Sequence, residues 1–191
     1  MQAFKFFNSN MDCTMGKGTY HYEPGVKYVE NEANCVKNGF HACEYIFDCL
    51  SYYRSISDSM VYLVEAAGDI DEDGTDSKIS CTEIELIKRL GIADMAYYAA
   101  QYIIVHPDRD VFINNRDVEV SENEASANLI AIAIGEHPRA MTVEDGVMVL
   151  IQKENGHFTK AKIWASKAGK WYTLDSEGRI YEKEENRAAA H

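Results

Sequence analysis

Two stretches in the first half of the chain have the residue types of buried β-strands. Residues 3–7 are apolar and aromatic on both sides of Lys5, and residues 60–67 are rich in β-branched and aromatic side chains. Such side chains are enriched in strands because they pack well on a pleated surface. We therefore predict strands at both places, and a shorter one over residues 40–43, after a turn signal at Asn38-Gly39.

Three segments have the periodicity or the end signals of helices. Residues 44–53 place apolar side chains at helical spacing. Thr82 and Glu85 have the spacing of a capping box, which predicts a helix that runs to residue 90. Residues 93–105 form a face of small and apolar side chains that ends before Pro107, and we predict a second long helix there.

The last third of the chain has the pattern of short strands separated by turns. We predict strands over residues 146–152, 161–165 and 171–174, with a hairpin turn at Asn155-Gly156. The pattern as a whole predicts an α+β fold. Its parts would be a mixed N-terminal lobe with two or three helices (residues 1–120) and a C-terminal antiparallel β element packed on it (residues 121–187). Residues 188–191 have the look of a vector-derived linker and are left out of this prediction.

Net charge adds a candidate surface to this picture. The chain carries 31 acidic and 19 basic residues, a formal charge of −12, so we expect no direct binding to nucleic acid, whose phosphates require clustered cations. Between positions 65 and 85 only Lys78 offsets eight acidic residues: Glu65, Asp69, Asp71, Glu72, Asp73, Asp76, Glu83 and Glu85. Such a patch attracts a basic protein surface, although a merely solvated acidic face explains it as well.

Several classes of protein are disfavoured by what the sequence lacks. No apolar run has the roughly 18–20 residues that cross a bilayer, and the first residues do not form a secretory signal, so we expect a cytoplasmic protein without a membrane partner. Five cysteines, an odd number, are expected to be reduced thiols. We expect neither a cofactor nor a metal, because the cysteines lack metal-ligand spacing.

One motif resembles the start of a calcium-binding loop. Asp69, Asp71 and Asp73 alternate and are followed by Gly74, as in the first six positions of such a loop. The twelfth position is Ser80, where a calcium loop places a bidentate Glu. We therefore interpret these residues as a tight turn after the strand over residues 60–67.

Both ends of the chain resemble an uncharacterised family of tailed-phage accessory proteins. The resemblance rests on four motifs in order: Tyr22-Glu23-Pro24-Gly25, Gly39-Phe40-His41-Ala42-Cys43, Tyr52-Tyr53 and Trp171-Tyr172-Thr173-Leu174. Many members carry a long run of Ala- and Gly-rich repeats between the ends, and here it shrinks to a few residues around 125–140. Because a solenoid needs several stacked repeats, we expect this segment to be part of the globular fold.

The resemblance implies a phage or prophage protein that acts on its bacterial host. Small acidic proteins of this kind include inhibitors of host defence, and the leading hypothesis is an anti-CRISPR protein that binds a Cas nuclease or its guide-RNA complex. The predicted interface is the acidic segment together with two adjacent tyrosines on the helix over residues 93–105, Tyr97 and Tyr98. A non-enzymatic virion or structural accessory protein is a further alternative.

An enzymatic alternative rests on a fainter resemblance, to ADP-ribosyltransferases that use NAD. The segment from Gly39 to Tyr52 is similar to their strand and helix, in which an aromatic side chain stacks on nicotinamide. The resemblance implies four candidate catalytic residues: His21, His41, Tyr52 and Glu65. Glu65 comes too early in the chain for the late glutamate of such enzymes, and we expect a structural role for His41 instead.

Overall fold

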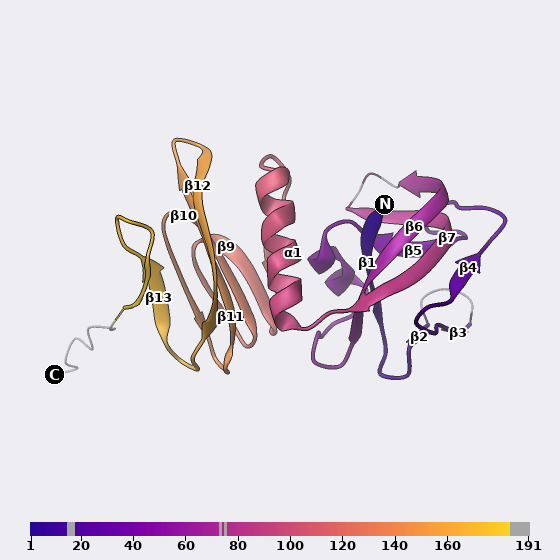
Figure 1. The fold of residues 1–191 in the computed structure, drawn as a ribbon, viewed down its shortest axis with the longest axis horizontal. Coiled ribbons are helices and arrows are strands. Elements are labelled where there is room, and N and C mark those ends of the chain that lie inside the picture. Colours follow the sequence, from indigo (N-terminus) through magenta and orange to yellow (C-terminus); the bar gives the residue numbers. More distant parts are fainter. Residues whose placement is uncertain (15–17, 73, 75, 184–191) are drawn as a thin grey trace. The chain divides into compact units, whose positions relative to one another are not determined.

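The chain forms two compact units, which are described separately. The computed structural model describes residues 1–14, 18–72, 74 and 76–183. The first unit is Met1–Gly91 and the second begins at Ile92 (Figure 1). The lobe boundary predicted after residue 120 falls inside strand β9 (Val118–Ala127), and the segment 188–191 that was set aside lies outside the described residues.

The predicted α+β fold with two or three helices is wrong, because the described chain is mostly β. It contains fourteen strands, one α-helix, α1 (Ile92–Val105), and one 3-10 helix, η1 (Ile46–Ser51). The helix predicted over residues 93–105 is confirmed by α1, whereas the helix predicted over residues 44–53 is reduced to η1. The strands predicted over residues 3–7, 40–43 and 60–67 are confirmed.

Unit 1 is built on four strands that close into a ring. The described part of unit 1 contains seven strands in all: β1 (Gln2–Phe7), β2 (Asp12–Cys13), β3 (Tyr20–His21), β4 (Lys27–Val29), β5 (Phe40–Cys43), β6 (Met60–Glu72) and β7 (Lys78–Arg89). β1 lies between β5 and β6, and β7 pairs antiparallel with both, so these four strands have no free edge between them. β4 extends the sheet at β7, while β2 and β3 form a separate hairpin.

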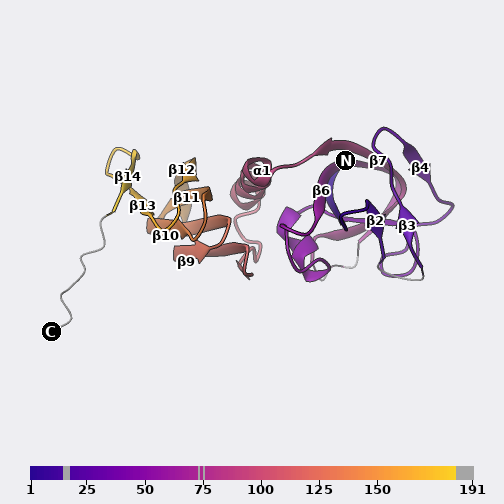
Figure 2. The same ribbon diagram turned by 90° about the horizontal axis from the view of Figure 1, so that it is seen from below.

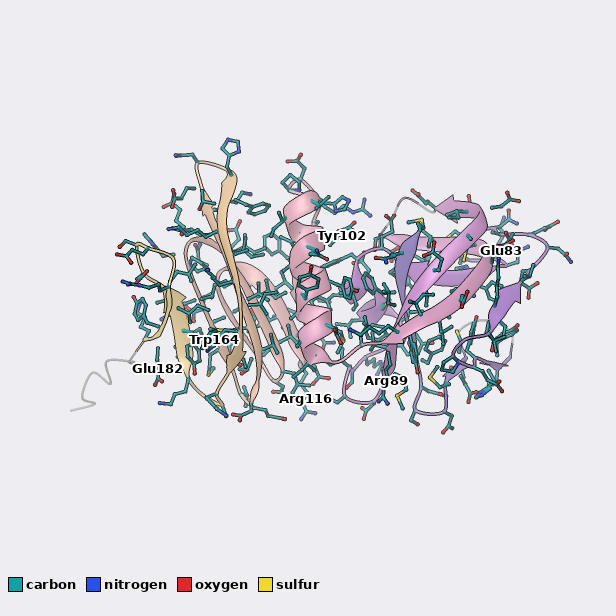
Figure 3. The ribbon with its side chains drawn as sticks, in the orientation of Figure 1. Glu83, Arg89, Tyr102, Arg116, Trp164 and Glu182 are labelled. Carbon is teal, nitrogen blue, oxygen red and sulfur yellow. The ribbon has the colours of Figure 1, made fainter. Side chains whose placement is uncertain are left out.

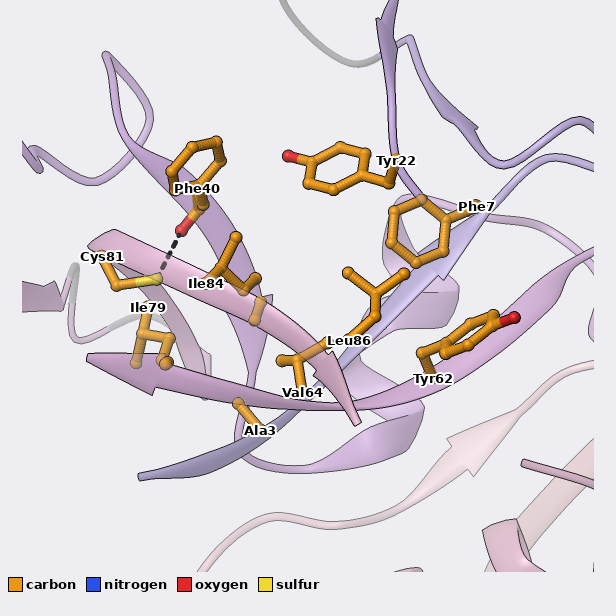
Figure 4. Close-up of a cluster of buried hydrophobic side chains, with 12 residues drawn as sticks. Ala3, Phe7, Tyr22, Phe40, Tyr62, Val64, Ile79, Cys81, Ile84 and Leu86 are labelled. Atoms are coloured by element: carbon orange, nitrogen blue, oxygen red, sulfur yellow. Dashed lines mark hydrogen bonds between the residues drawn. The ribbon is translucent and has the colours of Figure 1, made fainter. Parts of the chain in front are cut away.

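Aromatic side chains fill the inside of the ring. Phe7 is fully buried, with ring centroids 5.0 Å from Tyr22 and 5.9 Å from Tyr62. Figure 4 shows the rings of Phe7 and Tyr22 above aliphatic side chains of β6 and β7, among them Val64 and Leu86. Successive strand residues face opposite sides, so Lys5 shares the inward side of β1 with the cluster members Ala3 and Phe7.

The helix predicted to start at Thr82 is wrong, because Thr82 and Glu85 lie in β7. In this part of the strand Ile84 and Leu86 are buried and Glu83 and Glu85 are half-buried, which is the period-two pattern of a strand with one buried face. The Thr82 hydroxyl accepts a hydrogen bond from the backbone N–H of Asp69 on β6, at 2.9 Å, and so joins two strands. The spacing of Thr82 and Glu85 therefore does not mark the start of a helix here.

Unit 2 contains α1 and the remaining strands. They are β8 (Ile113–Asn114), β9 (Val118–Ala127), β10 (Ile130–Thr142), β11 (Gly146–Glu154), β12 (His157–Ser166), β13 (Trp171–Leu174) and β14 (Ile180–Glu182). The predicted C-terminal antiparallel element is wrong in its central pairings, because β9 with β10 and β10 with β11 are parallel. The pairings of β12, β13 and β14 are antiparallel.

The parallel strands are stacked turns of a coil. Only Asn128 and Leu129 separate β9 from β10, yet Ile130 lies beside Val118, the first residue of β9. Parallel neighbours normally need a crossover of a dozen or more residues, so β9 must itself turn back. It does so near Asn123, which has φ +58°, and β10 shifts register at the equivalent place. The repeat-like segment is thus part of a globular unit, as expected, and coils within it.

Small side chains line the inside of this coil. Ala125 and Ala140 belong to one layer, and Ala131 and Ala133, from the first half of β10, belong to the other, with larger residues at Met148, Leu150 and Tyr172. Ile130 and Ile132, on the opposite face of the layer that contains Ala131 and Ala133, are also fully buried. Here α1 contacts β10, β11 and β12 through its buried side chains, and Figure 2 shows it end-on beside these strands.

Candidate functional site

The acid-rich segment forms a two-stranded ribbon. We call the acidic ribbon the six carboxylates that β6 and β7 carry: Glu65, Asp69, Asp71, Glu72, Glu83 and Glu85. Glu65 and Glu85 are direct cross-strand partners. Like charges in that position destabilise a sheet, so the fold tolerates a local cost here.

Some acidic residues of this segment hold the fold together. Asp71 accepts a hydrogen bond from the backbone N–H of Cys35 at 2.7 Å, and Glu83 (labelled in Figure 3) forms a salt bridge with Lys27 at 2.7 Å. The Glu65 carboxylate lies 3.1 Å from the amino group of Met1. Asp76, beyond the end of β6, accepts hydrogen bonds from the Tyr52 hydroxyl and from the backbone N–H of Lys78, each 2.8 Å long.

Other members of the ribbon are available to a partner. Asp69 and Glu72 are exposed and Glu85 is half-buried. Among the described residues, the side chains of these three make no hydrogen bond or salt bridge. The predicted surface therefore divides into carboxylates that stabilise unit 1 and carboxylates that face solvent.

The tight turn predicted over the alternating aspartates is wrong for Asp69 and Asp71, because both lie in β6, and Asp73 lies outside the described residues. In the described part of the chain no three potential ligands come together for a metal ion.

We therefore expect millimolar calcium to leave the melting temperature unchanged. A ligand at about 100 times its dissociation constant adds roughly 2.7 kcal/mol to folding stability, so thermal unfolding would detect a site of even modest affinity. A calcium-specific rise that is absent with magnesium and abolished in Asp71→Asn would contradict this.

A cavity of about 750 Å³ opens in unit 1 where β1 and β5 diverge. These strands have one registered residue pair, Phe4 with Cys43, and Phe4, Lys5 and Phe6 line the cavity together with all four residues of β5. The other walls come from the β2–β3 hairpin, from residues 30–39 and from Tyr52, Tyr53 and Lys78. The residues that line the cavity are Phe4, Lys5, Phe6, Cys13, Gly18, Thr19, Tyr20, Tyr22, Glu30, Val36, Lys37, Asn38, Gly39, Phe40, His41, Ala42, Cys43, Cys49, Tyr52, Tyr53 and Lys78.

Lys5 carries the only ammonium group in this wall that is fully buried within the described chain, with 5% of its surface exposed. Its Nζ donates one hydrogen bond, to the backbone carbonyl of His41 at 2.6 Å. It lies 5.2 Å from the ring centroid of Tyr22 and 5.7 Å from that of Phe7, and aromatic faces attract cations at such distances. No carboxylate of the described chain pairs with it.

A second polar group, formed by Tyr52 and Lys78, also lines the cavity. The Tyr52 hydroxyl accepts a hydrogen bond from Lys78 Nζ at 2.9 Å and donates the one to Asp76. Burial raises the pKa of Tyr52 to about 12, with Asp76 adding to the shift and Lys78 opposing it. Tyr52 is therefore a neutral phenol at physiological pH, and Lys78 is linked to a carboxylate through it.

Two thiols in and near this cavity, those of Cys43 and Cys81, are protonated at neutral pH. A hydrogen bond with Cys49, followed by burial, raises the pKa of Cys43, and burial raises the pKa of Cys81 to about 11. All five cysteines are free thiols. A nucleophilic cysteine needs a lowered pKa, so neither Cys43 nor Cys81 has the environment of a catalytic thiolate.

The four residues of the enzymatic alternative are only partly brought together. His41 and Tyr52 line the cavity, whereas His21 and Glu65 are not among its lining residues. His21 is exposed and pairs with Asp12 at 2.8 Å. His41 Nε2 accepts a hydrogen bond from the backbone N–H of Val36 at 2.9 Å, and this contact holds Val36 at φ +71°, an unfavourable conformation for a β-branched residue.

The two tyrosines of the predicted interface belong to the other unit. Tyr97 and Tyr98 lie on α1, where Tyr97 is 47% exposed and its hydroxyl accepts a hydrogen bond from Gln101 at 2.8 Å. They are thus not joined to the acidic ribbon within one unit. Sequence reasoning missed Lys5, although a single lysine inside an apolar strand was a visible signal.

Comparison with known proteins places the N-terminal part of the chain in a family. Residues 1–98, just over half of the chain, match the family model described as a domain of unknown function, DUF7666. The chain belongs to this family. The DUF7666 match covers all of unit 1, including the acidic ribbon and the cavity, and the first residues of α1. No curated protein and no solved structure matches the chain significantly. Within the described residues, no helix is both long and apolar enough to span a bilayer.

Proposed function

We propose that this protein is a phage- or prophage-encoded binding protein that inhibits a host defence system through its acidic ribbon. The observation that supports this is the alignment of carboxylates along two paired strands, with Glu65 opposite Glu85 and with solvent-facing groups at Asp69 and Glu72. A local concentration of negative charge speeds encounter with a basic surface. The leading partner is a Cas nuclease or its guide-RNA complex in the bacterial cytoplasm, by the resemblance to phage accessory proteins.

Two alternatives have less support. An NAD-dependent ADP-ribosyltransferase would need its histidine, aromatic and glutamate residues around one pocket, and the cavity wall contains only His41 and Tyr52 of the four candidates. A virion or structural accessory role would not require the concentration of acidic side chains on one ribbon.

Charge reversal at the solvent-facing carboxylates tests the proposal. We expect Asp69→Lys, Glu72→Lys and Glu85→Lys together to weaken inhibition of target-DNA cleavage by a guide-loaded Cas nuclease at least about tenfold, because electrostatic steering changes association rates by 10–10³. Asp71 and Asp76 are left intact because their carboxylates hold the fold. Folding should be nearly unchanged, since Asp69 and Glu72 are exposed and exposed charges shift stability by about 0.5 kcal/mol or less, and since Glu85→Lys replaces a like-charge pair with Glu65 by an opposite-charge one.

The matched control makes the same change in net charge, but on unit 2. Asp108→Lys, Glu122→Lys and Glu144→Lys alter three exposed acidic residues outside the acidic ribbon and should leave inhibition intact. Inhibition by the wild type should also weaken as salt rises from about 0.1 to 1 M, since the Debye length falls from about 10 to 3 Å. Equal inhibition by both triple variants, or no inhibition by the wild type, would contradict the proposal.

A further inference from the structure

The cavity of unit 1 contains a buried ammonium group that the protein leaves incompletely bonded, and a tyrosine hydroxyl near it. The Lys5 ammonium can donate three hydrogen bonds and donates one, to a neutral carbonyl. Tyr22 lines the same cavity and is 4% exposed as a whole residue; its hydroxyl makes no hydrogen bond within the described chain and is not one of the fully buried atoms that lack a partner, so it keeps contact with the solvent of the cavity. Burial raises the pKa of Tyr22, so its hydroxyl keeps its proton and remains a donor.

A buried ammonium group without a carboxylate partner, such as that of Lys5, is rare in a protein interior. Buried polar groups are hydrogen-bonded in the large majority of cases, and buried charges are paired. Here the two groups are neighbours, since Lys5 Nζ lies 5.2 Å from the Tyr22 ring centroid. Figure 4 shows the Tyr22 hydroxyl pointing away from Phe7, on the side of the cluster where Phe40 lies. Both residues line the cavity, so one ligand can contact both groups.

Charge matching at that position indicates a singly charged group. Lys78 is linked through Tyr52 to Asp76, and the exposed Lys37 lines the cavity together with the exposed Glu30. This leaves one uncompensated positive charge, that of Lys5. One ammonium and one phenol O–H complement a carboxylate, whereas a phosphate dianion would be left with an unpaired negative charge in a poorly solvated place.

The remaining walls indicate the body of the ligand. The rings of Tyr20 and Phe40 line the same cavity near Tyr22, with centroids 4.9 Å apart for Tyr20–Tyr22 and 5.9 Å apart for Tyr20–Phe40. Such rings receive a flat aromatic group edge-on or offset-stacked. The cavity volume of about 750 Å³ is within the range of small-molecule sites. The strained Val36, held by His41, lies in the same wall, and backbone strain concentrates at ligand sites.

We propose that the cavity of unit 1 binds a small aromatic carboxylate, with Lys5 and Tyr22 holding the carboxylate group and Tyr20 and Phe40 contacting the ring. The site is independent of the acidic ribbon, so it can exist whether or not the protein inhibits a host defence system.

Calorimetry on the full chain tests this with a set of simple probes. Benzoate, phenylacetate and indole-3-acetate supply the carboxylate on rings of different size, benzamide removes the charge, and phenyl phosphate replaces the carboxylate by a dianion. We expect at least one carboxylate to bind about tenfold or more tightly than benzamide and phenyl phosphate, because a hydrogen bond to a charged group is worth about that factor or more.

Substitutions then assign the two donors. Tyr22→Phe keeps the ring and should weaken binding about five- to tenfold, and Lys5→Met keeps an unbranched apolar side chain and should weaken it more than tenfold. Lys37→Met is the matched control, since Lys37 lines the cavity but is exposed, and its effect should stay below about twofold. If Lys5→Met does not fold, the ¹³Cε resonance of Lys5 in the wild type provides the same information, because it should shift as the carboxylate is added.

Three results would overturn the proposal. They are no binding of any carboxylate probe at about 10 mM, equal binding by the wild type and Tyr22→Phe with no change at the Lys5 resonance, and tighter binding of phenyl phosphate or benzamide than of the matching carboxylate. The first would mean that water alone solvates the two donors.

Discussion

Replacing Phe7 by alanine is expected to lower the free energy of unfolding by about 3–5 kcal/mol, the usual cost of removing a fully buried phenylalanine. The side chain has no exposed surface and stands inside the strand ring between Tyr22 and Tyr62. Because β1, β5, β6 and β7 close on themselves, the walls around the vacated space can collapse only a little. Urea unfolding followed by tyrosine fluorescence measures the effect.

A matched substitution at an exposed phenylalanine separates the effect of burial from the effect of removing a phenyl ring. Phe112 is 52% exposed, so Phe112→Ala removes the same ring with little loss of packing and should cost less than about 1 kcal/mol. Phe7→Leu should fall between the two. If Phe7→Ala cost no more than Phe112→Ala, the closed aromatic core would be contradicted.

Replacing Gly39 by alanine is expected to cost about 3–4 kcal/mol, for two separable reasons. Gly39 has φ +83°, where any side chain is strained by about 1–2 kcal/mol. A Cβ there would lie 2.4 Å from Ser80 Oγ, 3.0 Å from the Ala33 Cα and 3.0 Å from the Cys81 carbonyl oxygen. Two of these three atoms are backbone, which cannot rotate away, so the steric cost adds to the conformational cost.

Gly156 provides the control, because it has the same φ, +83°, with nothing within 4 Å of the position of a Cβ. Gly156→Ala should therefore show the conformational cost alone, about 1–2 kcal/mol. The difference between the two variants in urea unfolding measures the close approach of β5 to β7. Equal costs would show that the β5–β7 contact yields to a methyl group. Gly39 also lines the cavity, so binding of the carboxylate probes should weaken in Gly39→Ala.

The sequence alone determined the elements whose signals are local. The strand around Lys5, the strand that begins at Met60 and the helix before Pro107 were predicted from residue type and periodicity, and all three are present. The concentration of acidic residues between positions 65 and 85 was also visible in the sequence. These features can be predicted from the sequence because each depends on residues only a few positions apart.

The tertiary structure decided everything that depends on pairing between distant residues. Thr82 and Glu85 have the spacing of a helix cap, yet strands on both sides of β7 take its backbone hydrogen bonds. The coil of β9 and β10 arises from contacts twelve residues apart, such as Ile130 with Val118, which no local period indicates. The sequence shows Lys5 inside an apolar strand, but only the closure of β1, β5, β6 and β7 places its ammonium near Tyr22 in a cavity. Local preferences set which segments can become strands, whereas register and closure depend on the simultaneous burial of side chains that lie far apart in the chain.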